Sequence, residues 1–156
     1  MYWSAGEKPL SNSQLAKLMT LYEQNYVQVR MLIPRLQSMP AGVYWSRLDN
    51  CLDLRLQVLE VSPYTTTINL SYVFDGSTRG HAAPDLQIRV YHDARSCEVL
   101  SGLVHGHRLT TRKVRTLTGS WQLNRFLYKW LRYCRFRGHR FDVEHAGGCS
   151  LNAAAG

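Results

Sequence analysis

Apolar residues recur every three or four positions in two stretches of the chain, one near each end. In the first stretch, residues 13–33, they are Leu15, Leu18, Tyr22, Tyr26, Val29 and Ile33. This spacing places them on one face of an α-helix. Ser11 or Ser13 can cap its start, and Pro34 predicts its end because the residue before a proline disfavours the helical region.

The second helical stretch, residues 121–137, has the more continuous apolar stripe. Its core-facing positions follow the steps i, i+3, i+4, i+7, i+8 and i+11 and are Leu123, Phe126, Leu127, Trp130, Leu131 and Cys134. We expect Ser120 to be its N-cap, and Gly138 to follow the last helical residue, where glycine is favoured.

Between the two predicted helices, apolar and polar residues alternate with a period of two, which is typical of half-buried strands. The alternating runs are residues 52–58, 64–74, 86–91 and 97–101, and a further strand is expected at 104–111. Segment 35–46 contains Pro40 and Gly42 and is predicted to be a loop. The pattern therefore predicts an α+β fold: an antiparallel meander of four or five strands, with the N-terminal and C-terminal helices packed on one face.

The 156-residue length fits a single domain, which we place at residues 13–141. Residues 1–12 and 142–156 show no periodicity, and we expect both segments to be flexible. The cysteines are far apart in the sequence and form no C-x-x-C pair, so we expect free thiols in a reducing compartment. No apolar run approaches the ~20 residues needed to cross a bilayer, and the chain starts with no signal peptide. These features predict a cytoplasmic protein without a membrane partner.

The net charge of +8 is concentrated in the last third of the chain. Residues 1–107 carry nine basic and nine acidic residues, whereas residues 108–156 carry ten basic and two acidic residues. No Asp or Glu occurs between residues 100 and 141. This asymmetry favours an anionic partner, because a field of one sign attracts ligands of the other.

Basic and aromatic side chains lie together on one face of the predicted C-terminal helix. Arginine binds phosphates through two hydrogen bonds and stacks on bases, and aromatic rings also stack on bases. We therefore expect a phosphate-bearing ligand, RNA or a nucleotide, at Arg108, Arg112, Lys113, Arg115, Arg125, Tyr128, Lys129 and Arg132. The alternative is that these charges only keep the helix solvated, although a solvated helix normally mixes signs, and like charges four residues apart are destabilising.

A second set of candidates, Arg89, Tyr91, His92 and Asp93, surrounds a His-Asp doublet. Adjacent residues of a strand point to opposite faces, so the doublet could act as a pair only in a turn. The alternation on either side predicts such a hairpin turn, in which Asp commonly bonds to nearby backbone. A hydrolase that uses His92 and Asp93 is therefore the least favoured of three functions. The other two are a non-enzymatic phosphate-binding protein and a protein adaptor or regulator that engages an acidic partner protein.

We expect no metal and no cofactor. His105 and His107 could chelate a metal from one strand face, but a third ligand would have to arrive through the fold. The chain has no glycine-rich phosphate loop that joins a strand to a helix.

Four segments carry a family likeness: LYEQNYVQVRMLIP (21–34), LEVSPYTTTINLSY (59–72), IRVYHDARSCEVLS (88–101) and LNRFLYKWLRYCRFRGH (123–139). In this order they resemble the YqiB-like proteobacterial family, and the likeness covers roughly residues 15–140. The resemblance implies a small cytoplasmic protein from a family of unknown function. It transfers no catalytic residue to this chain.

Overall fold

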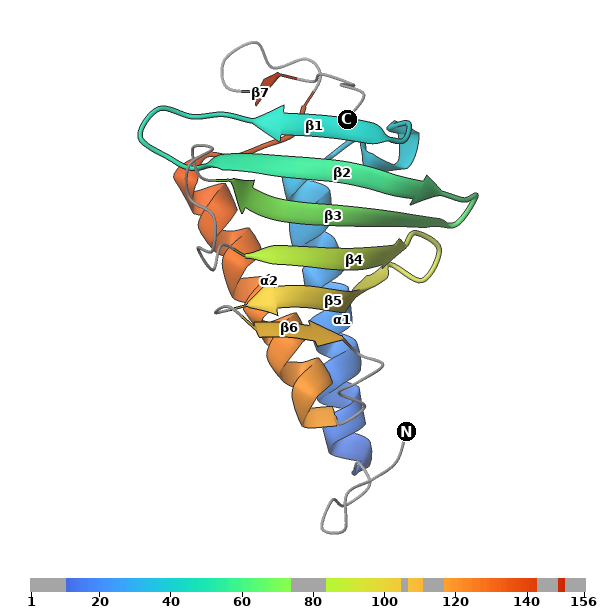
Figure 1. The fold of residues 1–156 in the computed structure, drawn as a ribbon. Coiled ribbons are helices and arrows are strands. Elements are labelled where there is room, and N and C mark those ends of the chain that lie inside the picture. Colours follow the sequence, from blue (N-terminus) through green and yellow to red (C-terminus); the bar gives the residue numbers. More distant parts are fainter. Residues whose placement is uncertain (1–10, 74–83, 105–106, 111–116, 143–148, 151–156) are drawn as a thin grey trace.

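The computed structural model describes residues 11–73, 84–104, 107–110, 117–142 and 149–150. Among these residues, seven strands form one antiparallel sheet, and two helices cover one of its faces (Figure 1). The helices are α1 (Asn12–Leu32) and α2 (Leu117–Arg137). The strands are β1 (Gly42–Ser46), β2 (Asp53–Val61), β3 (Thr65–Val73), β4 (Asp85–Tyr91), β5 (Ser96–Val104), β6 (His107–Thr110) and β7 (Cys149–Ser150). Their order in the sheet is β6-β5-β4-β3-β2-β1-β7, so β1 to β6 form a continuous meander.

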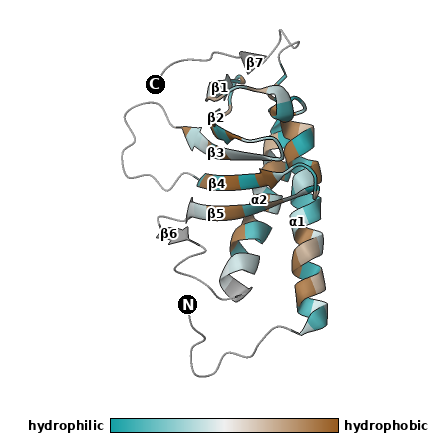
Figure 2. Cartoon of the chain, turned by 90° about the vertical axis from the view of Figure 1, so that its right-hand side faces the viewer, coloured by the Kyte–Doolittle hydropathy of each residue, from teal (hydrophilic) through white to brown (hydrophobic). Residues whose placement is uncertain are grey.

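The predicted α+β fold class, with a meander and two flanking helices, is confirmed. Figure 2 shows the sheet nearly edge-on with both helices on the same side. Neither described helix is long and apolar enough to span a bilayer.

The sheet is larger than predicted at one edge. Segment 35–46 is not all loop: it contains a short 3₁₀ helix, Leu36–Ser38, and strand β1, which pairs with β2. Val43 and Tyr44 are both buried, and burial on both faces removes the period-two signal by which strands are recognised. The two residues of β7, from the predicted flexible tail, pair with Trp45 and Ser46 of β1.

Two further boundaries differ from the prediction. The strand expected at 104–111 begins at His107, because β5 extends to Val104. The remainder of the predicted flexible ends, residues 1–10, 143–148 and 151–156, lies outside the described residues.

Helix α1 begins with a capping box at Ser11. The backbone N–H of Gln14 donates to the Ser11 hydroxyl at 3.2 Å, and the backbone N–H of Ser11 donates to the Gln14 side chain at 3.0 Å. The helix ends at Leu32, with Ile33 as its C-cap just before Pro34. The predicted apolar face is covered except at Leu15, which is 46% exposed, because the first turns of α1 extend beyond the core.

Helix α2 begins four residues earlier than predicted, so Ser120 lies inside the helix and is not its N-cap. The carbonyl of Ser120 instead accepts a hydrogen bond from Nδ2 of Asn124 at 2.8 Å. The first helical turn need not follow the apolar stripe, which explains why periodicity placed the start too late. The predicted end is confirmed: Gly138 has φ +103°, and the N–H groups of Gly138 and His139 donate to Arg135 and Cys134, which is a Schellman motif.

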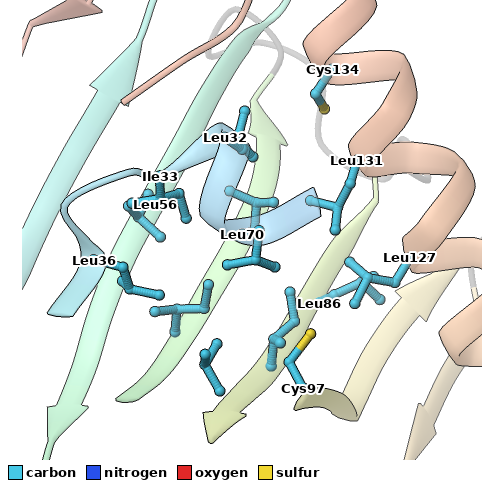
Figure 3. Close-up of a cluster of buried hydrophobic side chains, with 14 of the residues drawn as sticks. Leu32, Ile33, Leu36, Leu56, Leu70, Leu86, Cys97, Leu127, Leu131 and Cys134 are labelled. Carbon is cyan, nitrogen blue, oxygen red and sulfur yellow. The ribbon is translucent and has the colours of Figure 1, made fainter. Parts of the chain in front are cut away.

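The core lies between the helices and the sheet, and Figure 3 shows its centre. Leu127, Leu131 and Cys134 of α2 are fully buried there, as are Val29 and Leu32 of α1. This packing turns one face of each helix to the sheet and leaves the other faces available to solvent.

Two contacts set the direction of the helices relative to each other. Nδ2 of Asn25 donates to the backbone carbonyl of Asn124 at 2.9 Å, and Nη1 of Arg135 donates to Oε1 of Gln28 at 2.6 Å. Gln28 follows Asn25 along α1, and its partner Arg135 likewise follows Asn124 along α2. The two helices therefore lie side by side and run parallel. Oδ1 of Asn124 also accepts a hydrogen bond from the backbone N–H of Val99 at 3.0 Å, which ties the helix pair to β5.

Candidate functional site: a basic groove between the helices

An open groove of about 560 Å³ lies between α1 and α2. On the α2 side it is lined by four of the residues predicted from the sequence, Arg125, Tyr128, Lys129 and Arg132, together with Trp121. On the α1 side it is lined by Ala16, Lys17, Thr20, Leu21 and Gln24. We call these ten residues the basic groove.

Helical geometry explains why the α2 residues gather there. At 3.6 residues per turn, steps of four and three keep Arg125, Lys129 and Arg132 on one face. All three are exposed, whereas Leu127 and Leu131, on the other side of the helix, are buried in the core. The apolar stripe that fixes α2 on the sheet therefore also aims its basic face outward.

The groove is positively charged, and none of the described residues that line it is acidic. Its four cations are Lys17, Arg125, Lys129 and Arg132, and within the described part of the chain none of them forms an ion pair. Helix α2 contains no Asp or Glu, and the one acid of α1, Glu23, does not line the groove. The guanidinium of Arg132 lies over the ring of Tyr128, 5.6 Å from its centroid, in a cation–π contact. Charges of one sign in a concave site raise the local concentration of oppositely charged ligands.

Other basic residues of α2 have partners elsewhere. Arg135 bonds Gln28, as described above, and the guanidinium of Arg137 donates to Sγ of Cys51 at 3.1 and 3.2 Å and to the carbonyl of Asn50 at 3.1 Å. The basic residues that line the groove are therefore distinguished from their neighbours by the absence of such partners among the described residues.

The remaining predicted basic residues cannot be added to the groove. Arg112, Lys113 and Arg115 lie outside the described residues, and Arg108 lies on β6, of which only the backbone is described. Their part in ligand binding stays a prediction.

The predicted hairpin turn at His92 and Asp93 is confirmed, since β4 ends at Tyr91 and β5 begins at Ser96. His92 is buried, and its Nε2 lies 2.8 Å from Oγ1 of Thr66. Burial, helped by the nearby charge of Arg30, lowers the pKa of His92. Asp93 is exposed and accepts a hydrogen bond from the backbone N–H of Ala94 at 2.9 Å. The two side chains thus have separate partners.

Arg89 and Tyr91 lie on the face of the sheet that the helices do not cover. The Tyr91 hydroxyl donates to Oε1 of Glu98 at 2.8 Å, and Nε of Arg89 is 3.5 Å from Oγ1 of Thr67. Burial is the first cause of the raised pKa of Tyr91, and its hydrogen bond with Glu98 adds to it. These contacts form part of a polar network on the outer side of the sheet, away from the basic groove.

A second histidine, His139, also lies in a polar contact. Its Nδ1 is 2.8 Å from Oγ of Ser46, and burial lowers its pKa. Both side chains are buried, so the serine is not accessible to a substrate. Within the described ranges no three His, Cys, Asp or Glu side chains are grouped so that they could hold a metal ion. His105 and the side chain of His107 lie outside that description.

Sequence reasoning missed Lys17 and Trp121 as groove residues. Lys17 is an isolated charge on α1, and its role depends on which face of α1 packs beside α2. Trp121 is the first residue of the stretch predicted as helix. Its aromatic side chain, close in sequence to the basic residues, was the signal that could have indicated a place in the groove.

The fold and the groove define a small two-layer α+β protein with a basic groove between its parallel helices. The chain belongs to the family described as "Protein of unknown function (DUF1249)", which matches residues 28–140. The match includes all of α2 and only the last turns of α1, so Lys17 lies before it. It is similar to the "Uncharacterized protein YqiB" of Escherichia coli strain K12, with 29% identity over 127 residues that cover 78% of this chain and 89% of the relative. The YqiB proteins of Escherichia coli O6:H1 and O157:H7 match with the same identity and coverage. No solved structure matches the chain.

Proposed function

We propose that the basic groove binds a phosphate-bearing ligand, either RNA or a nucleotide. The observation that carries this proposal is the gathering of Lys17, Arg125, Lys129 and Arg132 in one groove whose described lining residues include no acid. Guanidinium groups can donate two parallel hydrogen bonds to phosphate oxygens, and an ammonium group adds a point charge. Trp121 and Tyr128 supply aromatic rings on which a base can stack.

The energetics of α2 support a role for these charges. Arg125 and Lys129 are four residues apart, and Lys129 and Arg132 are three apart, so each pair repels. Such pairs destabilise a helix by about 0.2–0.5 kcal/mol each. A bound polyanion would remove this cost, whereas solvation alone is achieved equally well by a face of mixed charge.

The lining of the groove supports binding and not catalysis. It supplies positive charge, two aromatic rings and the polar side chains of Thr20 and Gln24. The ten described lining residues include no His, Cys, Asp or Glu, the side chains that most often transfer protons or attack substrates at neutral pH. The groove volume of about 560 Å³ is within the ~300–1,000 Å³ range of small-molecule sites.

Binding of labelled RNA and of nucleotides at two salt concentrations tests the proposal. If about four phosphates are neutralised, the slope of log K against log salt is about −0.7 per phosphate, and affinity falls by roughly 50-fold between ~50 and ~200 mM salt. Affinity that does not change with salt would contradict the proposal.

Two variants separate the effect of the groove's charge on binding from any effect on folding. Replacing Arg125, Lys129 and Arg132 together by glutamate inverts the sign of the groove but keeps like charges among these three positions, so their mutual repulsion is unchanged. This variant should lose binding. Arg95→Glu, in the exposed turn between β4 and β5, should bind like the wild type. Equal affinity of the triple variant and the wild type would refute a role for the basic groove.

The second candidate function is an adaptor that engages an acidic partner protein through the same groove. It is favoured by Val27 and Met31, which are 48% and 49% exposed and follow Gln24 by one and two turns of α1. Exposed apolar side chains beside a charged groove are typical of protein interfaces. Recovery of one acidic protein from an affinity purification treated with nuclease, without nucleotide binding by the purified chain, would favour this function.

We propose the cytoplasm as the location. Cys51, Cys97 and Cys134 are free thiols, which fits a reducing compartment.

A further inference from the structure

Phe136 is the most exposed large apolar side chain among the described residues, with 86% of its surface accessible. It lies in the last turn of α2, four residues after Arg132 and seven after Lys129. These steps keep it on the face that carries the cations of the basic groove. Side chains of a helix lean toward its N-terminus, which directs the Phe136 side chain toward the turn that holds Arg132.

The outer face of α2 therefore carries aromatic and basic residues together from the groove to the end of the helix. In order, this face carries Trp121, Arg125, Tyr128, Lys129, Arg132 and Phe136. At 100° per residue these six positions fall within a sector of about 100°. We call this row the α2 stripe.

The length of the α2 stripe decides between ligands. Fifteen residues separate Trp121 from Phe136, which corresponds to about 22 Å of helix. A stacked strand advances ~3.4 Å per nucleotide, so the stripe matches about six stacked nucleotides and fewer in a more extended strand. A mononucleotide bound in the basic groove can contact Trp121, but it is too short to contact Phe136 as well.

We propose that the α2 stripe binds a single-stranded nucleic acid, with phosphates at Arg125, Lys129 and Arg132 and bases stacked on Trp121 and Phe136. This proposal rests on the proposed function, because it uses the same groove and extends it by one turn of α2. Cations combined with aromatic rings along one surface are the means by which proteins bind single strands without reading their sequence. A duplex fits less well, since its bases are already stacked on one another and have no free faces to offer.

A membrane surface fits less well too. Helices that lie on membranes insert a broad apolar face between the lipids. The broad apolar face of α2 is occupied by the core: Leu123, Leu127 and Leu131 are buried against the sheet and α1. The exposed large hydrophobic side chains among the described residues of α2 are Tyr133 and Phe136, which are separate rings and not a broad apolar face, and such rings suit stacking on bases.

A length series tests this inference. Fluorescence anisotropy would measure the binding of adenosine monophosphate and of labelled oligoadenylates of three, six and twelve nucleotides, each as RNA and as DNA. Affinity should rise with length up to about six nucleotides and then level off for a single site. RNA and DNA of equal affinity would support recognition of phosphates and bases, and a preference for RNA would support added contacts to the 2′-hydroxyl.

Phe136→Ala isolates the new part of the site. Loss of one base-stacking contact should weaken the six-nucleotide strand by roughly 5- to 150-fold and leave the mononucleotide unaffected. Tyr64→Ala is the matched control, since Tyr64 is 66% exposed but lies in the turn between β2 and β3. Phe136→Trp should retain binding.

The outcomes distinguish this inference from the proposed function. Equal affinity for mononucleotide and oligonucleotides, or an unchanged Phe136→Ala variant, would overturn the single-strand proposal and leave a nucleotide-binding groove. No binding of either ligand at low salt would overturn both. Binding to vesicles of anionic phospholipid, without binding to oligonucleotides, would also overturn both.

Discussion

Replacing Lys129 with glutamate should make the fold more stable while it weakens binding in the basic groove. Lys129 stands between two other cations of α2, Arg125 four residues before it and Arg132 three residues after it. Lys129 therefore takes part in two repulsive pairs at the spacings where helical side chains meet. The substitution converts both into attractive pairs.

The expected gain follows from these two pairs. Each changes from a destabilising to a stabilising contribution of about 0.2–0.5 kcal/mol, so the sum is about 0.8–2 kcal/mol. Lys and Glu have similar helix propensities, and position 129 is too far from either end for the helix dipole to contribute. For a domain of this size, a gain of that magnitude raises the melting temperature by about 2–8 °C.

Urea unfolding at low ionic strength measures the gain, and Arg95→Glu is the control that changes net charge by the same two units. The midpoint should rise for Lys129→Glu and stay near the wild-type value for Arg95→Glu. The gain should shrink at high salt, which screens exposed charges. A Lys129→Glu protein that unfolds at the same or lower urea concentration than Arg95→Glu would show that the basic face carries no repulsive cost, and the energetic support for the proposed function would fail.

Three other predictions concern the scaffold that holds the groove. Gly138→Ala should lower the free energy of unfolding by about 1–2 kcal/mol, because φ is +103° there while space for a methyl group is available; an unchanged urea midpoint would contradict this. Asn124→Leu leaves the buried N–H of Val99 without its acceptor and should cost about 1–3 kcal/mol, with faster hydrogen exchange of that amide as the specific readout. Burial lowers the pKa of His92 and His139 below 6.5, so the unfolded chain binds more protons, and stability should fall as the pH drops below about 6.5. A variant with glutamine at both histidines should have a flatter stability profile between pH 7 and 5, and a profile as steep as that of the wild type would exclude these groups as its cause.

Local signals in the sequence were sufficient for the core face and the end of α2, although they placed its start four residues too late. Its apolar stripe and the position of Gly138 depend on contacts within a few residues, and both were predicted correctly. Strand β1 was missed because Val43 and Tyr44 are buried on opposite faces, so the segment shows no alternation. Strand β7 has two residues, which is too short for any period.

Only the part of the candidate site that depends on local helical geometry could be predicted from the sequence. Arg125, Lys129 and Arg132 share a face by helical geometry alone, whereas Lys17 joins them through the packing of α1 beside α2, which no local pattern encodes. The turn at His92 followed from the alternation on either side of it. The burial of His92 beside Thr66 could not be predicted in this way, because it depends on the pairing of β3 with β4.

The two walls of the basic groove come from opposite ends of the chain. Asn25 and Asn124, which join the helices, are 99 residues apart in the sequence, and the whole meander lies between them. Contacts of this kind are made only when a long loop closes, which costs conformational entropy. During synthesis α2 also emerges after every strand of the meander. The groove is therefore absent from incomplete or partly folded chains, and retention on an oligonucleotide resin would separate finished molecules from truncated ones if the proposed ligand is correct.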